Sequence, residues 1–584
     1  MRNAKIVCTL GPASESRSTI RELADAGMSV ARLNASHGSR EDRAAVIDRI
    51  REVDDATKDP LAAMVDLQGP EIRTAPLDDS IFLEEDTEVR FVQGDHANSE
   101  EVGLSLPIEG VGEGDRILLD DGRIQTTVLR TEGDAVVAHV DDGGELPGRK
   151  GVNIPGVDLN LDVVTENDRK DLELAAEKNA DFVAASFVRD ADDVYEVSEV
   201  LEELDADIPI IAKIERAGAV ENLEEIVDAA YGVMVARGDL GVECPMEDVP
   251  MIQKRIIRTC RDAGVPVITA TEMLDSMVSA RRPTRAEASD VANAVIDGTD
   301  GVMLSGETAI GDHPVRVVEA MDRIVRQVER SEEYAELREQ RVPTAGDART
   351  DAIARSARYL ARDIGADAIV AASESGYTAL KTAKFRPAVP VVASTPNDRV
   401  RRQLALSWGV NPQYAPLADE GADAVIENAV GAALSAGVAE SGDTVVVLSG
   451  MMTELEGAST TNMLKVHVAA ETLVTGRSVV VGRVVGPVAG SADGDLSAVP
   501  EGAILALDES FEGEFDGDAE KLGGIVDAAS GMTGYPALVA RELGIPMISG
   551  AALDAADGTV VTLDAERGVV YEGDVEAAQA DRPR

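Results

Sequence analysis

The sequence has few cysteines and no long apolar run. Its three cysteines (Cys8, Cys244 and Cys260) lack metal-ligand spacing, which excludes a disulfide framework and predicts a reduced protein. No stretch approaches the ~20 apolar residues of a membrane-spanning helix. The apolar run in the N-terminal MRNAKIVCTLGP is too short for a signal peptide. These absences predict a cytoplasmic protein without a membrane anchor.

Basic residues are also scarce. The chain has 55 Lys and Arg against 108 Asp and Glu, a net charge of −53. Repulsion among these negative charges destabilises the compact state in dilute salt, whereas molar salt screens the repulsion. Because 44% of the residues are hydrophobic, disorder is disfavoured and a halophilic-type surface is predicted. Nucleic acid and anionic membranes are excluded as partners, and an anionic substrate requires metal ions or clustered Arg and Lys.

Eight short apolar runs dominate the first part of the chain. They are nearly continuous in hydrophobicity, as strands buried on both faces are, and most are separated by segments of helical periodicity. This alternation predicts an α/β fold built on a (β/α)8 TIM barrel. The expected strands are 5–10, 30–34, 62–67, 182–186, 210–215, 232–237, 265–271 and 301–306.

Other segments predict further domains. The long gap after the third run, rich in turns such as DDG, predicts an inserted small β-barrel domain. DAIVAAS, VPVVAST and TVVVLSG predict a C-terminal α/β domain, and the last segment predicts an extra β-rich domain. The expected divisions are barrel 1–74, insert 75–150, barrel 151–340, α/β domain 345–475 and extra domain 478–584.

Charged residues stand at the ends of the predicted barrel strands, where barrel enzymes hold their chemistry. In IIAKIE, Lys213 and Glu215 are two residues apart on a strand, so both point to one face about 7 Å apart. Such a pair alone is better explained as a structural ion pair. The whole ring favours a site, since it is costly to assemble in an apolar barrel. Its members are Thr9, Arg32, Asn34, Asp66, Lys213, Glu215, Arg237, Asp239, Thr271, Ser305 and Glu307.

The residue types in this ring suggest a chemistry. Glu215 and Asp239 are hard oxygen ligands suited to Mg²⁺ or Mn²⁺. Lys213 and Arg32 suit an oxyanion or phosphoryl group, and Thr271 suits proton transfer, directly or through water.

Long motifs give the chain a family resemblance. KIVCTLGPAS, MSVARLNASHG, DLQGPEIRT, IIAKIE, VMVARGDLGVE, ITATEML and MLSGETAIG occur in order. Over residues 1 to about 475 the chain resembles the pyruvate kinases. The resemblance implies transfer of the phosphoryl group of phosphoenolpyruvate to ADP, giving pyruvate and ATP in the last step of glycolysis (EC 2.7.1.40).

The resemblance also implies residue roles. Arg32 and Lys213 would bind the phosphoryl group, Glu215 and Asp239 the divalent metal, and the backbone around Arg237, Gly238 and Asp239 the substrate carboxylate. Thr271 would lie beside the carbon that is protonated. The nucleotide would contact Asn34, Ser36, His37, Arg73 and Lys150.

A monovalent cation site is implied as well. Its members would be Asn34, Ser36, Asp66 and the carbonyl of residue 67, which is Leu67 here and usually Thr in the family. Glu71 in GPEIR resembles the potassium-dependent members, so K⁺ is expected beside Mg²⁺ or Mn²⁺. His37 could also act as a general base, although a hydrogen-bonded turn residue is the better explanation.

A Ser/Gly/Thr loop, SESGYT, follows DAIVAAS, and its Ser373, Ser375, Gly376 and Thr378 form a possible phosphate-binding effector loop. Activated relatives often carry lysine at the position of Glu374, so fructose bisphosphate is in doubt as the effector. A nucleoside or sugar monophosphate, or no effector, stays open. Cys8 and Trp408 are expected to be core residues.

The tail resembles the phosphohistidine domain of phosphoenolpyruvate-utilising enzymes. The family's Thr-Ser-His reads Thr533-Gly534-Tyr535, and residues 478–584 contain no histidine, which excludes phosphohistidine chemistry there. Three alternative functions are weighed against pyruvate kinase activity. They are a synthase-like or dikinase-like phosphotransferase, an inactive metabolite-binding barrel, and a metal-dependent carbon–carbon lyase. The family resemblance implies a homotetramer.

Overall fold

The structure is a computed structural model that describes residues 2–108, 110–157, 161–416, 421–450, 461–491 and 493–575. The chain divides into two compact units. The first comprises Met1–Ala345, Ala383–Arg386 and Asp398–Pro412, and the second Gly346–Thr382, Pro387–Asn397 and Gln413–Arg584. Each unit has its own sheets and its own hydrophobic clusters.

A closed parallel barrel is the centre of the first unit. The strand order β1-β17-β16-β15-β14-β13-β3-β2 confirms the predicted TIM barrel, and each of the eight predicted runs supplies one strand. The strands are β1 (Lys5–Thr9), β2 (Val30–Asn34), β3 (Ala62–Asp66), β13 (Phe182–Ala185), β14 (Ile210–Ile214), β15 (Gly232–Ala236), β16 (Val267–Ala270) and β17 (Gly301–Leu304).

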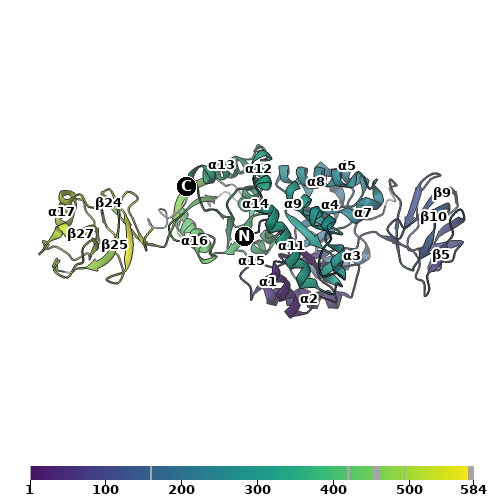
Figure 1. The fold of residues 1–584 in the computed structure, drawn as a ribbon, viewed down its shortest axis with the longest axis horizontal. Helices are drawn as coiled ribbons and strands as arrows, with labels where there is room; N and C mark the ends of the chain where they lie inside the picture. Colours follow the sequence, from purple (N-terminus) through teal and green to yellow (C-terminus); the bar gives the residue numbers. More distant parts are fainter. Residues whose placement is uncertain are drawn as a thin grey trace. The chain divides into compact units, whose positions relative to one another are not determined.

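Most helices of the first unit lie around the outside of this barrel (Figure 1). Several begin at a capping box, in which the N-cap Ser or Thr and the residue at N3 satisfy each other's free N–H groups. They are α1 (Arg17–Ala26), α2 (Arg40–Asp54), α3 (Glu166–Glu177), α4 (Ala191–Glu203), α5 (Ala217–Glu221), α6 (Leu223–Ala229), α7 (Arg237–Glu243), α8 (Val249–Ala263), η1 (Asp275–Val278), α9 (Arg285–Asp297), α10 (Gly306–Ala309), α11 (Pro314–Glu329), α12 (Glu332–Gln340), α15 (Asp398–Gln403) and η2 (Leu404–Leu406).

The segment between β3 and β13 forms the expected β insertion. It contains a seven-stranded sheet in the order β4-β12-β8-β9-β10-β6-β7 and a two-stranded ladder, β11-β5. Its strands are β4 (Ile72–Arg73), β5 (Ile81–Leu83), β6 (Glu88–Gln93), β7 (Glu101–Leu104), β8 (Arg116–Leu119), β9 (Ile124–Glu132), β10 (Ala135–Asp142), β11 (Gly144–Leu146) and β12 (Gly151–Asn153). Phe91, Leu119 and Val140 lie in its separate apolar cluster.

The α/β part after the barrel has a five-stranded sheet in the order β20-β19-β18-β21-β22. Three strands match the predicted runs, whereas β20 and the antiparallel edge strand β22 were not predicted. The elements are α13 (Arg349–Ile364), β18 (Ala368–Ala372), α14 (Tyr377–Lys384), β19 (Val391–Thr395), β20 (Val410–Tyr414), α16 (Gly421–Ser435), β21 (Asp443–Ser449) and β22 (Met463–Ala469).

The tail forms an eight-stranded sheet, β23-β30-β29-β25-β26-β27-β28-β24, as expected of a β-rich domain with some helix. Strands β25 to β28 run parallel, and the flanking pairs are antiparallel. The elements are β23 (Thr472–Thr475), β24 (Arg477–Val480), β25 (Arg483–Gly490), β26 (Ala503–Leu507), η3 (Ala519–Lys521), β27 (Leu522–Asp527), α17 (Tyr535–Leu543), β28 (Met547–Ser549), β29 (Val560–Asp564) and β30 (Val569–Glu572).

The two predicted core residues lie in the core of the first unit. Cys8 is fully buried on β1. Trp408 is 1% exposed, its indole N–H donates to the Tyr334 hydroxyl at 3.1 Å, and Arg386 stacks over its ring at 4.8 Å. Within the part of the chain that the structure describes, no helix has the length and apolarity needed to cross a membrane.

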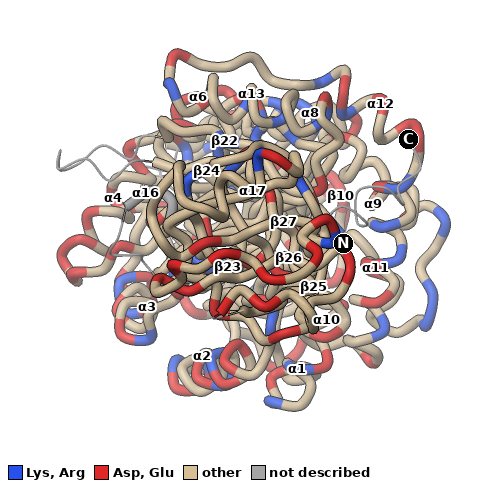
Figure 2. Tube along the Cα trace, turned by 90° about the vertical axis from the view of Figure 1, so that its left-hand side faces the viewer, with Lys and Arg blue, Asp and Glu red and all other residues tan. Residues whose placement is uncertain are grey.

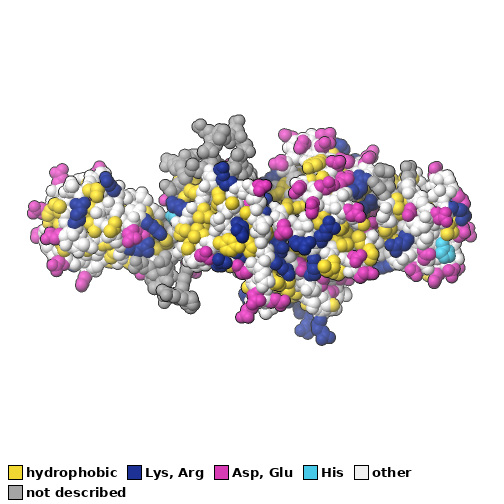
Figure 3. Space-filling view, turned by 90° about the horizontal axis from the view of Figure 1, so that it is seen from above, with side chains coloured by type: hydrophobic (Ala, Val, Ile, Leu, Met, Phe, Trp, Pro, Cys, Tyr) yellow, Lys and Arg dark blue, Asp and Glu magenta, His cyan; other side chains and the backbone are white. Residues whose placement is uncertain are grey.

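Carboxylates dominate the surface charge. Red Asp and Glu segments outnumber blue Lys and Arg segments along the trace (Figure 2), and carboxylates are spread over the visible face in the space-filling view (Figure 3). The acidic excess of the composition is therefore distributed over the described parts of the fold.

Candidate active site

Strand alternation places the charged ring inside the barrel mouth. Val30, Met64, Ala184 and Ile211 belong to the apolar cluster that fills the barrel interior. Because side chains on a strand repeat every two residues, the next interior positions are Arg32, Asp66, Ser186 and Lys213. These positions lie at the carboxyl ends of their strands, where a barrel presents its functional groups.

Lys213 lies at the centre of this network. It is 9% exposed, and its Nζ is 2.7 Å from Glu215 Oε1, 2.7 Å from Ser186 Oγ and 3.4 Å from Asp66 Oδ1. Burial alone would lower the pKa of Lys213, but Asp66 and Glu215 outweigh burial and raise the pKa. The lysine is therefore a fixed positive charge at the pH of the cell.

Arg32 shares Asp66 with Lys213. The Arg32 Nε donates to Asp66 Oδ2 at 2.5 Å, and Arg32 Nη1 donates to Thr9 Oγ1 at 2.9 Å. Burial would raise the pKa of Asp66, but the two cations outweigh burial and lower it. Asp66 therefore stays ionised between Arg32 and Lys213, and all three side chains are held in place.

Glu215 and Asp239 form the carboxylate side of the site. Glu215 Oε2 accepts a hydrogen bond from the Phe187 backbone N–H at 2.6 Å, and the residue is 2% exposed. Burial and the neighbouring Glu215 carboxylate raise the pKa of Asp239 to about 7. A divalent cation would relieve this crowding, so the pair fits the metal site expected from the sequence.

The described structure shows no third metal-binding side chain beside this carboxylate pair. Among the described residues, no group of three or more His, Cys, Asp or Glu side chains is arranged to hold a metal. Mg²⁺ is commonly bound by one or two carboxylates together with substrate oxygens and water. The pair therefore suits a metal that is completed by the substrate.

The end of β16 approaches the first turn of α7. Thr271 has φ +71°, and the side chain of Arg237 holds this bend by donating to Ala270 O at 3.1 Å and to Thr271 O at 2.6 Å. A Cβ on Gly238 would lie 2.8 Å from Thr271 Cγ2, so a glycine is needed there. Arg237 is thus a backbone support for Thr271, with Asp290 as its ion-pair partner at 2.6 Å.

The residues expected to bind a monovalent cation lie close in sheet register. Asn34 pairs with Asp66 across β2 and β3, and Ser36 N–H donates to Asn34 Oδ1 at 3.1 Å. Asp66 Oδ1 is buried and makes no hydrogen bond. Leu67 O accepts from Ser186 Oγ at 2.7 Å. A buried carboxylate oxygen without a hydrogen bond fits a cation ligand, so the set is compatible with K⁺.

The residues expected at the nucleotide have other partners. Arg73 binds Glu71 Oε2 at 2.7 Å, and Lys150 Nζ binds Asp120 Oδ1 at 2.7 Å. His37 is exposed after β2, and its backbone N–H donates to Asn34 O at 3.3 Å, which fits a turn residue. None of the three has a described contact with Lys213, so the structure leaves their nucleotide role as an expectation.

Sequence reasoning missed Ser186 and Phe187, which contact Lys213 and Glu215 directly. Both belong to the segment ASFVR, residues 185–189, and the two-residue alternation from Ala184 could have identified Ser186 as an interior position. Ser305 and Glu307, in contrast, support backbone: Glu307 accepts from Ser305 N at 2.6 Å and from Leu274 N at 3.1 Å.

In the second unit, the loop 373–378 connects β18 to α14. Gly376 has φ +78°, Thr378 N donates to Ser373 Oγ at 3.4 Å, and Thr378 Oγ1 is 2.8 Å from Thr461 Oγ1. Ser375 precedes the helix within this loop. The loop has the expected turn at a helix start, and its residues are ordered by side-chain hydroxyls.

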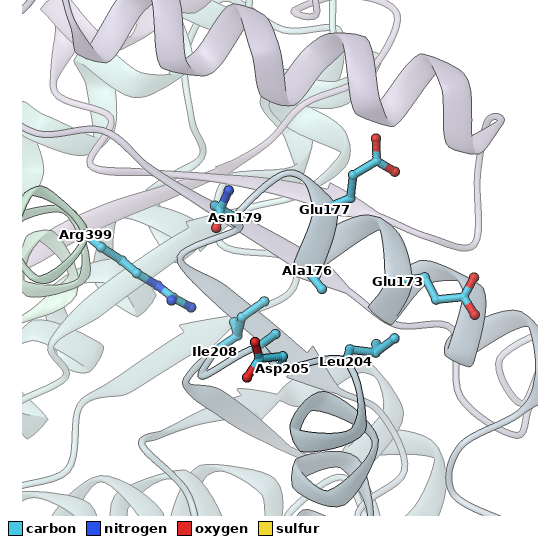
Figure 4. Close-up of a pocket in the computed structure, with 9 residues that line it drawn as sticks. Glu173, Ala176, Glu177, Asn179, Leu204, Asp205, Ile208 and Arg399 are labelled. Carbon is cyan, nitrogen blue, oxygen red and sulfur yellow. The ribbon is translucent and has the colours of Figure 1, made fainter.

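Two cavities lie elsewhere. A cavity of about 320 Å³ lies near the amino end of β14, where Arg399 reaches toward Ile208 and Asp205 opposite the helix that carries Glu173 and Glu177 (Figure 4). In the tail domain, a cavity of about 630 Å³ is lined by Asp508, Glu509 and Asp554. The first lies at the barrel end opposite the charged ring, since Ile208 precedes β14.

A closed parallel barrel whose mouth combines Arg32, Lys213 and a Glu–Asp pair is the arrangement expected of a phosphoryl-transfer enzyme. Residues 1–318 match the profile described as pyruvate kinase, barrel domain, and residues 351–467 match the pyruvate kinase alpha/beta domain. The chain belongs to the pyruvate kinase family. Residues 499–568 match the mobile domain of PEP-utilising enzymes, which confirms the resemblance of the tail.

Relatives that align with the chain over nearly their full length are named pyruvate kinase. The chain is 42% identical over 587 residues to a pyruvate kinase of Staphylococcus epidermidis and 43% identical over 586 residues to one of Geobacillus stearothermophilus. It is 41% identical over 583 residues to one of Staphylococcus aureus. Each alignment covers 98% of this chain and 99% of the relative. The chain is a kinase of this class, and its reaction passes a phosphoryl group from phosphoenolpyruvate to ADP.

Proposed function

We propose that the ring around Lys213 performs this phosphoryl transfer with the roles expected from the sequence. Arg32 binds the phosphoryl group, and Lys213 stabilises its charge during transfer and the enolate that forms. The observation that supports this proposal is the buried network in which Lys213 touches Glu215 at 2.7 Å while Arg32 and Lys213 share Asp66. Fixed cations in a closed pocket stabilise developing charge without reorganisation.

Glu215 and Asp239 hold the divalent ion, Mg²⁺ or Mn²⁺. Bound there, the ion supplies positive charge to the phosphoryl and enolate oxygens. The backbone N–H groups of Gly238 and Asp239, in the first turn of α7, bind the substrate carboxylate. The glycine required beside Thr271 supports this assignment, since it lets the backbone approach closely.

Thr271 lies beside the carbon that gains a proton when enolpyruvate becomes pyruvate. It delivers that proton directly or through water. Its positive φ and the support from Arg237 keep the hydroxyl in a fixed place at the barrel mouth.

The remaining binding roles follow the family resemblance. Asn34, Ser36, His37, Arg73 and Lys150 contact the nucleotide. Asn34, Ser36, Asp66 and the Leu67 carbonyl bind K⁺, and Asp66 Oδ1 without a hydrogen bond supports that set.

We also propose a domain division and a setting. The divisions are barrel 1–74 and 151–340, inserted lid 75–150, regulatory α/β domain 345–475 and extra domain 478–584. Ser373, Ser375, Gly376 and Thr378 form the effector loop. The enzyme is of halophilic type, which the net charge of −53 supports, and it is a cytoplasmic homotetramer, as the family resemblance implies.

The test is pyruvate formation from phosphoenolpyruvate and ADP with Mg²⁺ in molar KCl, comparing wild type with Lys213→Met. We expect kcat to fall by about 10²–10³-fold or more, since a positioned electrostatic donor of this kind contributes that much. Circular dichroism confirms that the variant is folded. Unchanged turnover in folded Lys213→Met would contradict the role of Lys213.

Two further variants make the result clear. Removing a buried cation leaves Asp66 and Glu215 uncompensated and costs about 3–5 kcal/mol of stability. Lys213→Arg keeps the charge and the fold while changing the donor geometry, so its turnover also falls. Lys178→Met removes a surface lysine that pairs with Asp48 at 2.8 Å and leaves turnover unchanged.

A further inference from the structure

Lys213 has three close partners, and two of them belong to proposed cation sites. Asp66, at 3.4 Å, is in the monovalent set, and Glu215, at 2.7 Å, is in the divalent set. Ser186, whose Oγ accepts from Lys213 Nζ at 2.7 Å, belongs to neither. When cations bind Asp66 and Glu215, the Ser186 hydroxyl remains as the partner that holds Lys213 in position.

Ser186 also touches the monovalent set directly. Its one hydroxyl hydrogen is donated to Leu67 O at 2.7 Å, while its oxygen accepts from Lys213. The hydrogen bonds therefore run in one direction, from Lys213 Nζ to Ser186 Oγ to Leu67 O. Leu67 O keeps a second lone pair for a cation.

The backbone fixes this hydroxyl tightly. Ser186 is 3% exposed, and the next residue, Phe187, has φ +60°, a conformation that is rare for a bulky side chain. The Phe187 N–H donates to Glu215 Oε2 at 2.6 Å. On the other side, a Cβ on Gly69 would lie 2.9 Å from both Ser186 Cβ and Phe187 Cδ2, so the 67–69 segment packs directly on this bend.

We propose that Ser186 is a positioning residue that couples the monovalent cation site to Lys213. Movement of Leu67 O on cation binding is passed to the lysine through one shared hydroxyl, while the adjoining Phe187 amide holds Glu215. This inference rests on the proposed K⁺ set and adds a residue to it. The Ser186 hydroxyl touches Lys213 Nζ and Leu67 O, so its effect is on the placement of Lys213.

The test compares wild type, Ser186→Ala and Thr126→Val in KCl and in tetramethylammonium chloride of equal ionic strength. Thr126 is a matched control, because it is fully buried and its hydroxyl also donates to a carbonyl, Ile117 O, at 3.0 Å. Three quantities are measured: kcat and KM for phosphoenolpyruvate, phosphoenolpyruvate binding by calorimetry without ADP, and the K⁺-dependent rise in Tm.

In wild type and Thr126→Val, we expect K⁺ to raise kcat and to tighten phosphoenolpyruvate binding by similar factors. In Ser186→Ala, the K⁺ stimulation of kcat falls about 10-fold or more, within the range of typical coupling between sites. The K⁺-dependent rise in Tm persists, because the cation ligands are intact. The effect falls on kcat more than on KM, as expected when the lysine is misplaced.

Three outcomes overturn the inference. If Ser186→Ala keeps the wild-type K⁺ stimulation, Ser186 does not couple the sites, although the K⁺ set stands. If the Tm response to K⁺ disappears with the stimulation, Ser186 is part of the cation site itself. If wild type responds equally to both salts, the K⁺ set fails and the inference fails with it.

Discussion

At the scale of single residues, the barrel mouth is short of positive charge. Arg32 and Lys213 face Asp66, Glu215 and Asp239, so the two cations cannot neutralise all three carboxylates. The excess is visible in Asp239, whose pKa rises to about 7 through burial and the nearby Glu215. Because the ring has more carboxylates than cations, it is suited to a metal ion that binds together with the substrate.

A second buried lysine lies outside the site and predicts a pH dependence of stability. Lys5 Nζ donates to Val410 O at 2.7 Å, and burial lowers the pKa of Lys5 to about 8. Between about pH 8 and 10.5 the unfolded chain binds this proton and the folded chain does not, so the Lys5 contribution to stability rises with pH. The rise is about 3 kcal/mol across that window.

Urea unfolding of wild type and Lys5→Met at pH 7 to 10.5 measures this effect. The free energy of unfolding of wild type, relative to that of Lys5→Met, should increase as pH rises. Lys178→Met, at the surface, controls for the loss of one ordinary lysine. A difference that does not change with pH would show that Lys5 keeps an ordinary pKa in the folded protein.

The charged ring could be predicted from the sequence because its members interrupt or end strands that are otherwise apolar. Lys213, Asp66 and Arg32 stand near the carboxyl ends of such strands. Ser186 carries no charge to mark it, so the two-residue alternation from Ala184 could have placed it inside the barrel but could not have named its partners. Its contact with Lys213 depends on the register of β13 beside β14, which cannot be read from the sequence alone.

At the scale of elements, α9 begins with a well-formed capping box. Thr284 Oγ1 accepts from Glu287 N–H at 3.2 Å, and Glu287 accepts from Thr284 N–H at 2.6 Å and from Ser276 N–H at 2.7 Å. Burial would raise the pKa of Glu287, but the bonds from Ser276 and Thr284 outweigh burial and lower it. The cap therefore ties α9 to the η1 segment beyond Thr271.

Thr284→Ala should lower the free energy of unfolding by about 1 kcal/mol, since it removes an N-cap hydroxyl. Urea titration monitored by circular dichroism measures the loss. Thr284→Ser keeps the hydroxyl and should restore most of it. The capping model of this helix start would be wrong if the alanine and serine variants were equally stable.

Element prediction succeeded where burial is uniform. All eight barrel strands follow near-continuous apolar runs, because both of their faces are covered. β22 was missed because Lys465 and Val466 are exposed in the middle of an edge strand, which weakens the apolar signal. β20 has the sequence VNPQY. Its proline and polar residues argue against a strand, and the strand becomes evident only from its pairing with β19.

At the scale of the whole molecule, the charge of −53 predicts salt-dependent stability. Charge repulsion extends over about 10 Å in 0.1 M salt and only about 3 Å in 1 M salt. Tm should therefore rise steeply as KCl is raised from about 0.1 M to molar concentration. Differential scanning calorimetry measures this shift.

NaCl provides the control, because screening depends on ionic strength and not on the kind of monovalent cation. Most of the rise in Tm should be the same in both salts, whereas the K⁺ stimulation of turnover should be specific to KCl. A Tm that does not change with salt would contradict the halophilic assignment. A rise confined to KCl would instead assign the stabilisation to bound K⁺.

The pairing of β3 with β13 joins segments on either side of the long insertion. Arg32 and Asp66 therefore leave the ribosome more than a hundred residues before Ser186 and Lys213. During that interval the nascent chain carries Arg32 and Asp66, which can pair with each other, but not yet Lys213. The site that we propose for phosphoryl transfer therefore forms only when the second half of the barrel closes on the first.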